Sequence, residues 1–147
     1  NQNRSRNNVI HSFLLFLQEH TVELMGLNVC LVLSIDEACI LKSLEISKSF
    51  ITKAKRLGFM INVRNFGVGI CSFEVLKGGH IDILTLKKNI IKDIKTDPIC
   101  EVIYSSIIQI SKKLNIMTMI ELDKDEHYDI IDQSEINLII RRGTWQG

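Results

Sequence analysis

The fold follows from residues 43–63, which read SLEISKSFITKAKRLGFMINV. Apolar side chains in the first part of this segment recur at helical spacing and form one stripe: Phe50, Ile51, Ala54 and Leu57. The stripe predicts a helix over Ser43–Leu57, and Gly58 follows as a residue that commonly ends helices. Met60–Val63 is then a short apolar run with the composition of a strand. A helix joined closely to a strand is a repeating unit of α/β folds.

The same alternation continues on both sides of this segment. Further runs with the length and composition of strands are Cys30–Ile35, Ile81–Leu84 and Met117–Ile120. A helix is expected from about His11 to His20, and short helices are expected after Cys71 and Asp125. Asp97 and Pro98 read as an N-cap and a first-turn proline, which open a helix that continues to Leu114. Ile136–Ile140 fits either a strand or a helix by its pattern.

Strands that alternate with helices predict a parallel sheet joined by right-handed crossovers. Four or five such strands fit either an open doubly wound sheet or part of a (β/α)8 barrel, and the pattern does not choose between them. A complete barrel needs about 250 residues, so a chain of 147 residues would be the later part of one. In both architectures the functional groups lie at the carboxyl ends of the strands.

The charge balance and hydropathy exclude several classes of function. The chain has 18 Lys and Arg against 17 Asp and Glu, a net charge of +1, so it lacks the field of one sign that binds nucleic acid or membrane surfaces. No apolar run approaches the roughly 20 residues of a membrane-spanning helix. The polar start at Asn1–Arg6 is unlike a signal peptide. We expect a cytoplasmic domain cut from a longer protein, whose upstream part could carry a membrane anchor.

The cysteines and histidines do not form a metal-binding pattern. The four cysteines, Cys30, Cys39, Cys71 and Cys100, show no C-x-x-C spacing, and the four histidines include no H-E-x-x-H pair. We expect buried, reduced thiols.

The residues around the second predicted strand resemble those of a known protein family. Gly58–Gly69 reads GFMINVRNFGVG, and it is followed by Val75-Leu-Lys77 and by Ile81-Asp-Ile-Leu84. This order and spacing resembles the latter part of an EAL domain, a family of cyclic-di-GMP phosphodiesterases built on a (β/α)8 barrel. The resemblance implies an α/β fold of about five parallel strands alternating with helices, a partial barrel. It also implies a single domain over residues 1–147 with the first barrel strands upstream, and a helix over Ile136–Arg142.

The family's active site, which the resemblance would place at the strand ends, holds two Mg²⁺ or Mn²⁺ ions on carboxylates that activate a water. The positions that retain a family residue are Glu37, Glu121, Gln146 and Asn3, with Gln2 in place of Asn3 if the alignment shifts by one. The positions that depart from the family are Ser34, Arg64, Asn65, Thr85, Lys87 and Lys124.

Four departures bear directly on the chemistry. Ser34 falls on a metal-binding glutamate, Arg64 and Asn65 fall on the paired aspartates before the Phe-Gly, and Thr85 falls on the catalytic lysine. Because Arg64 replaces an anion with a permanent cation, the resemblance implies no bound metal, no other cofactor and no phosphodiesterase activity. Glu121 is the natural partner of Arg64 across the barrel mouth, and we expect an ion pair there in place of a metal bridge.

The sequence therefore predicts a catalytically degenerate EAL-like domain that acts as a regulatory or protein-interaction module in bacterial signalling. A protein partner is expected, and a second copy of the chain is one candidate. The alternatives are a sensor that binds cyclic-di-GMP through Arg64 and Lys87, or a residual metal-dependent phosphodiesterase. RNA binding is the weakest hypothesis, because the chain is nearly neutral and has few aromatic residues.

Overall fold

The sheet of this protein consists of five parallel strands in the order β1-β2-β3-β4-β5. The computed structural model describes residues 2–27, 29–67, 73–123 and 135–142. The strands are β1 (Val32–Asp36), β2 (Met60–Phe66), β3 (Ile83–Leu86), β4 (Met117–Asp123) and β5 (Leu138–Arg142). A doubly wound sheet reverses its strand order at a switch point. Here the order follows the chain without reversal, as in a (β/α)8 barrel, which confirms the predicted partial barrel.

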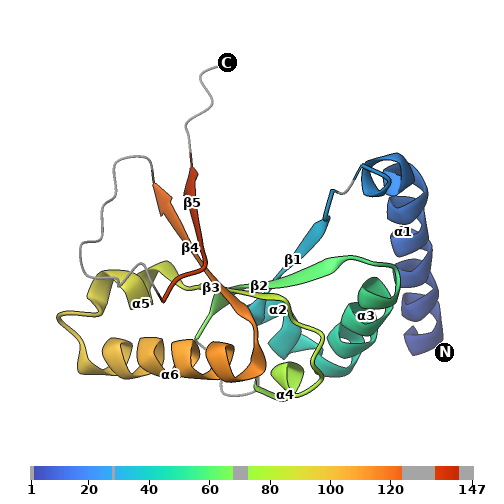
Figure 1. Cartoon of the computed structure of the whole chain (residues 1–147). Coiled ribbons are helices and arrows are strands. Elements are labelled where there is room, and N and C mark those ends of the chain that lie inside the picture. The colour runs from blue at the N-terminus through green and yellow to red at the C-terminus, as the bar shows by residue number, and fades with distance from the viewer. Residues whose placement is uncertain (1, 28, 68–72, 124–134, 143–147) are drawn as a thin grey trace.

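Helices connect β1 to β2, β2 to β3 and β3 to β4, and α3, α4 and α6 lie on one side of the sheet (Figure 1). The helices are α1 (Gln2–Met25), α2 (Glu37–Lys42), α3 (Leu44–Arg56), α4 (Phe73–Leu76), α5 (Lys88–Asp93) and α6 (Pro98–Leu114). The described part of the chain holds no helix that combines the length and the apolar character needed to cross a membrane.

Local signals in the sequence set the helix boundaries. Asp97 caps α6, because its Oδ1 accepts a hydrogen bond of 2.8 Å from the backbone N–H of Ile99, and Asn115 ends the helix at a φ of 57°. The predicted helices over Ser43–Leu57 and after Cys71 are confirmed as α3 and α4. The helix predicted from His11 to His20 is the middle of the longer α1. The helix predicted after Asp125 lies outside the described residues.

Two predictions about the chain are wrong. The helix predicted over Ile136–Arg142 is wrong, because Leu138–Arg142 form strand β5. This strand pairs in parallel with β4, with Ile140 opposite Glu121. Asn137 accepts a hydrogen bond of 2.8 Å from the backbone N–H of Thr118, which seats the start of the strand on its neighbour. The expectation of buried thiols also fails for Cys30 and Cys39, which are exposed, while Cys100 is half-buried.

The core lies between the sheet and its helices. Alternate residues of the inner strands contribute to it, and Ile61, Leu84 and Ile120 are each at most 2% exposed. Ile51 of α3 and Ile107 of α6 meet them from the helical layer. Because successive side chains of a strand point to opposite faces, the residues between these apolar positions lie on the other face of the sheet.

Gly67 stands where the end of β2 approaches the helices. Its φ is +116°, in the region that favours glycine. A Cβ atom at this position would lie 2.4 Å from Cδ1 of Ile90 in α5 and 3.1 Å from Cδ1 of Ile107 in α6. The close packing of the β2 terminus on α5 and α6 therefore requires a residue without a side chain.

We expect Gly67→Ala to lower the free energy of unfolding by about 2–4 kcal/mol, since backbone strain and overpacking add. Gly58→Ala is the matched control, because Gly58 also has a positive φ of +90° but has open space around its Cα. It should cost only the backbone part, about 1–2 kcal/mol. Urea unfolding of the full-length protein measures both. Equal losses for the two variants would show that the contact with Ile90 does not constrain position 67.

Candidate functional site at the carboxyl ends of the strands

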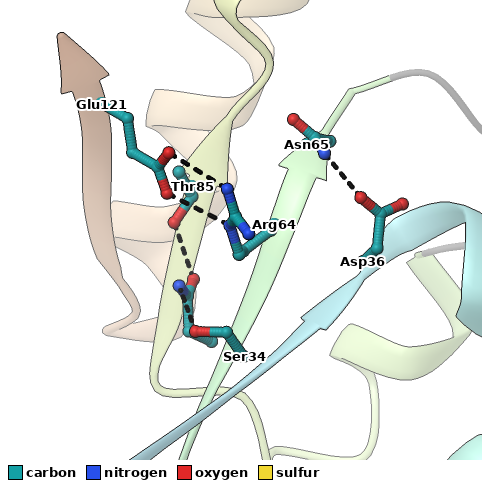
Figure 2. A network of polar contacts seen from close by, with 7 residues as sticks. Ser34, Asp36, Arg64, Asn65, Thr85 and Glu121 are labelled. Carbon is teal, nitrogen blue, oxygen red and sulfur yellow. Dashed lines mark hydrogen bonds and ion pairs between the residues drawn. The ribbon is translucent and has the colours of Figure 1, made fainter. Parts of the chain in front are cut away.

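Polar side chains from four neighbouring strands gather at the carboxyl end of the sheet, a site that we call the mouth. Figure 2 shows the residues concerned, which are Ser34 and Asp36 from β1, Arg64 and Asn65 from β2, Thr85 from β3 and Glu121 from β4. The parallel register aligns the strand ends, with Asp36 opposite Arg64 in the β1–β2 pair. All of these residues except Asp36 were singled out by the sequence, and the structure places them close together.

A hydrogen-bond chain crosses three strands beneath the mouth. The Thr85 hydroxyl donates to Oδ1 of Asn62 at 2.8 Å, and Nδ2 of Asn62 donates to the Ser34 hydroxyl at 3.2 Å. Asn62 and Thr85 are 1% and 3% exposed. Both of these buried side chains therefore have a partner, as burial requires. Asn62 was not among the predicted site residues, although a polar residue inside the apolar run Met60–Val63 was its available signal.

Arg64 and Glu121 form the ion pair that the sequence predicted. Nε of Arg64 lies 3.1 Å from Oε1 of Glu121, and one terminal nitrogen lies 3.1 Å from Oε2. This geometry is bidentate, which is the strongest arrangement of a guanidinium and a carboxylate. The side chains are 36% and 22% exposed. The pair joins β2 to β4 across the intervening strand β3 (Figure 2).

Asp36 and Asn65 form a second contact at the mouth. Nδ2 of Asn65 donates to Oδ2 of Asp36 at 2.5 Å, and the other Asp36 oxygen caps α2 by accepting from the backbone N–H of Ala38 at 2.9 Å. These two hydrogen bonds, the one from Asn65 foremost, hold the pKa of Asp36 below its ordinary value, and the charges of Arg64 and Lys87 act in the same direction. Asp36 therefore stays ionised to a lower pH than an ordinary aspartate does.

The remaining charged residues complete two hollows at the mouth. Lys88 forms an ion pair with Asp123, and both line a cavity of about 280 Å³ beside Arg64 and Glu121. A second cavity of about 280 Å³ lies between Asp36, Glu37 and Lys87. Glu37, in the first turn of α2, is 1% exposed.

The side chains of three predicted site residues lie outside the part of the chain that the structure describes. Lys124 and Gln146 lie outside the described residues. Asn3 belongs to α1, and only its backbone is described there.

The charges at the mouth are largely matched within the protein. Its acids are Asp36, Glu37, Glu121 and Asp123, and its cations are Arg64, Lys87 and Lys88. Within residues 2–27, 29–67, 73–123 and 135–142, no three His, Cys, Asp or Glu side chains are grouped so that they could hold a metal ion. Both oxygens of Glu121 contact the guanidinium of Arg64. The carboxylates of Asp36, Glu121 and Asp123 therefore interact with protein cations and amides.

Comparison with known proteins identifies the family to which this chain is similar. The family model described as EAL domain matches residues 5–139. The cyclic di-GMP phosphodiesterase PdeR of Escherichia coli (strain K12) is 26% identical over 105 residues, which are 71% of this chain and 15% of PdeR. The signaling protein YkoW of Bacillus subtilis (strain 168) is 31% identical over 91 residues, which are 62% of this chain and 11% of YkoW. The chain thus spans a small part of either relative.

One solved structure shows the likeness of fold. It is Vibrio cholerae LapD S helix-GGDEF-EAL bound to c-di-GMP, which matches with a TM-score of 0.63 and 16% identity. The match covers 84% of this chain and 29% of the LapD chain. At this identity the likeness concerns the arrangement of strands and helices.

A double-mutant cycle measures the Arg64–Glu121 pair. With Arg64→Met and Glu121→Gln, we expect a coupling of about 1 kcal/mol in the free energy of unfolding, at the upper end for partly exposed pairs because the contact is bidentate. Lys48 and Glu45, whose charged atoms are 3.8 Å apart on one helix, supply the control cycle. Their coupling should be about 0.3 kcal/mol. A value for Arg64–Glu121 no larger than the control would contradict a structural role.

Asn65→Gly tests the contact that holds Asp36. Glycine accepts the φ of 55° at this position, so the variant removes the amide donor without backbone strain. We expect the pKa of Asp36, followed by NMR titration of its carboxyl carbon, to rise toward the ordinary value.

The stability should change with pH in a defined direction. Because the folded pKa of Asp36 is lowered, its contribution is present above the unfolded pKa and is lost as pH falls through the folded pKa. The stability difference between wild type and Asn65→Gly should shrink over that range. An unchanged Asp36 titration in the variant would show that Asn65 does not hold the carboxylate.

Proposed function

The chain belongs to the EAL domain family, and on that premise we propose that it is a catalytically degenerate member. It acts as a regulatory or protein-interaction module in bacterial cyclic-di-GMP signalling, without phosphodiesterase activity of its own. The observation that carries this proposal is the bidentate pair of Arg64 with Glu121. It occupies the place where the resemblance puts metal ligands.

The residues of the mouth do not fit two divalent cations. Hard cations bind where several carboxylates are free to converge, and two-metal hydrolysis needs both ions to stabilise the attacking and leaving oxygens. Ser34 offers a neutral hydroxyl that already accepts a hydrogen bond from Asn62. Arg64 would repel a metal ion, and it engages both oxygens of Glu121. We therefore derive no step through a metal, and we propose that the domain has no cofactor.

The residue at the position of the family's catalytic lysine also supports an inactive domain. Thr85 has no titratable amine, and its hydroxyl donates to buried Asn62. A group that bridges two strands inside a closed network is unsuited to moving a proton at a substrate. The hydrogen-bond chain and the ion pair instead hold the strand ends together. What remains is a stable scaffold, which suits docking to a protein partner or to a second copy.

A cyclic-di-GMP sensor is the alternative, and one observation favours it. The LapD structure that shares this fold is bound to c-di-GMP. Arg64 and Lys87 lie at the mouth and carry the charge that phosphates need. Binding through Arg64 would require the guanidinium to leave Glu121, so the ion pair would oppose it. A residual phosphodiesterase is the enzyme alternative, and the same charges oppose it.

Calorimetry with cyclic-di-GMP on the full-length protein, with and without Mg²⁺, tests the proposal together with a hydrolysis assay. We expect no turnover in Mg²⁺ or Mn²⁺, because the mouth lacks a set of free carboxylates. Glu121→Gln is the control, since it removes the retained acid while it keeps the side-chain size. Metal-dependent cleavage that this variant abolishes would overturn the proposal. Binding without cleavage and without dependence on metal would select the sensor instead.

A further inference from the structure

A third cavity lies away from the strand ends, in the helical layer. It measures about 380 Å³ and is lined by α3, by α4 and by the turn that follows α4. Helix α4 has only four residues, so it covers less of the flank of α3 than a longer helix would. The cavity shares no lining residue with the mouth.

The wall formed by the turn is held by its own backbone. The N–H groups of Lys77, Gly78 and Gly79 donate to the carbonyls of Phe73, Val75 and Leu76 at 3.2, 3.3 and 3.2 Å. Gly79 has a positive φ of 66°, which closes the turn. The His80 ring then packs close to Gly78, where a Cβ would lie 3.4 Å from Cδ2 of the ring. The protein's own contacts therefore hold this wall in place, and small-molecule sites are usually formed in advance in this way.

The lining combines an apolar floor with a basic rim. Ile51 and Val75 are buried and form the apolar part. Lys48, Lys77 and half-buried His80 stand at the rim with the hydroxyl of Thr52. Glu74 is the acid among the lining residues, and it pairs with Lys77 at 2.5 Å. The charge of Lys48 also acts on Glu74, but less strongly than that of Lys77. Because the contact of Lys48 with Glu45 is long at 3.8 Å, Lys48 is the cation best placed to meet an anion.

We propose that this cavity binds a small organic anion, with its carboxylate or phosphate at Lys48 and its apolar body against Ile51 and Val75. The volume falls within the range of about 300–1,000 Å³ that small-molecule sites occupy. His80 and Thr52 offer further polar contacts to the same group. This proposal goes beyond the regulatory function and does not rest on it, since the two sites have no residue in common.

Calorimetry on the full-length protein at pH 7 tests the site with benzoate and phenyl phosphate as probes and benzyl alcohol as the neutral control. We expect saturable binding of at least one anion and at least tenfold weaker binding of the alcohol. Whichever anion binds more tightly identifies the acid class of the ligand. Equal affinity for the alcohol, or no saturable binding of either anion, would overturn the proposal.

A pair of charge-matched variants locates the binding. Lys48→Glu should weaken anion binding about tenfold, a change of about 1.4 kcal/mol. Lys113→Glu changes the net charge equally at an exposed position of α6, and it should leave the affinity unchanged. Equal losses in the two variants would show non-specific attraction and overturn the site. Since neither variant alters the mouth, a result here is independent of the cyclic-di-GMP titration.

Discussion

The polar site at the strand ends depends on one constraint, which the face of the sheet opposite the helices imposes. A polar side chain that is buried on this face must find a hydrogen-bond or charge partner within reach. Asn62 and Thr85 are almost fully buried and satisfy each other, and Ser34 extends the chain to β1. A buried polar group without a partner costs about 1–3 kcal/mol. The same demand applies to charge, so Arg64 is tolerated because Glu121 lies two strands away with both oxygens available.

Three departures from the family at the strand ends share one feature, which is the loss of an acidic side chain. The resemblance places acids at Ser34, Arg64 and Asn65, and clustered acids repel one another unless a cation lies between them. A serine, an arginine and an asparagine at these positions supply a hydroxyl, a cation and an amide donor. Arg64 engages Glu121 and Asn65 engages Asp36, so two acids of the mouth are bound to protein groups. In the degenerate domain that we propose, such internal interactions would take the place of contacts with metals.

Much of this arrangement was predictable, and the failures have physical reasons. Apolar runs and the Asp97 cap identified four strands and the long helices, because burial and capping depend on local residues. The Arg64–Glu121 pair was predictable because parallel strands align their carboxyl ends. Asn62 was missed because its role depends on cross-strand partners 28 and 23 residues away. The error at Ile136–Arg142 arose because a short apolar run has no decisive period, and only pairing with β4 selects the strand.

The alternation of side chains along a strand allows such a fold to change its polar site and keep its stability. In β2, Ile61 and Val63 belong to the core shared with the helices, whereas Asn62 and Arg64 take part in the polar contacts of the opposite face. Substitutions on the polar face change the site and leave the packing of the core intact. The core residues can therefore maintain the barrel scaffold while the mouth acquires a different set of charges. Gly67 marks the limit of this independence, because there the end of the strand turns from the mouth onto α5 and α6.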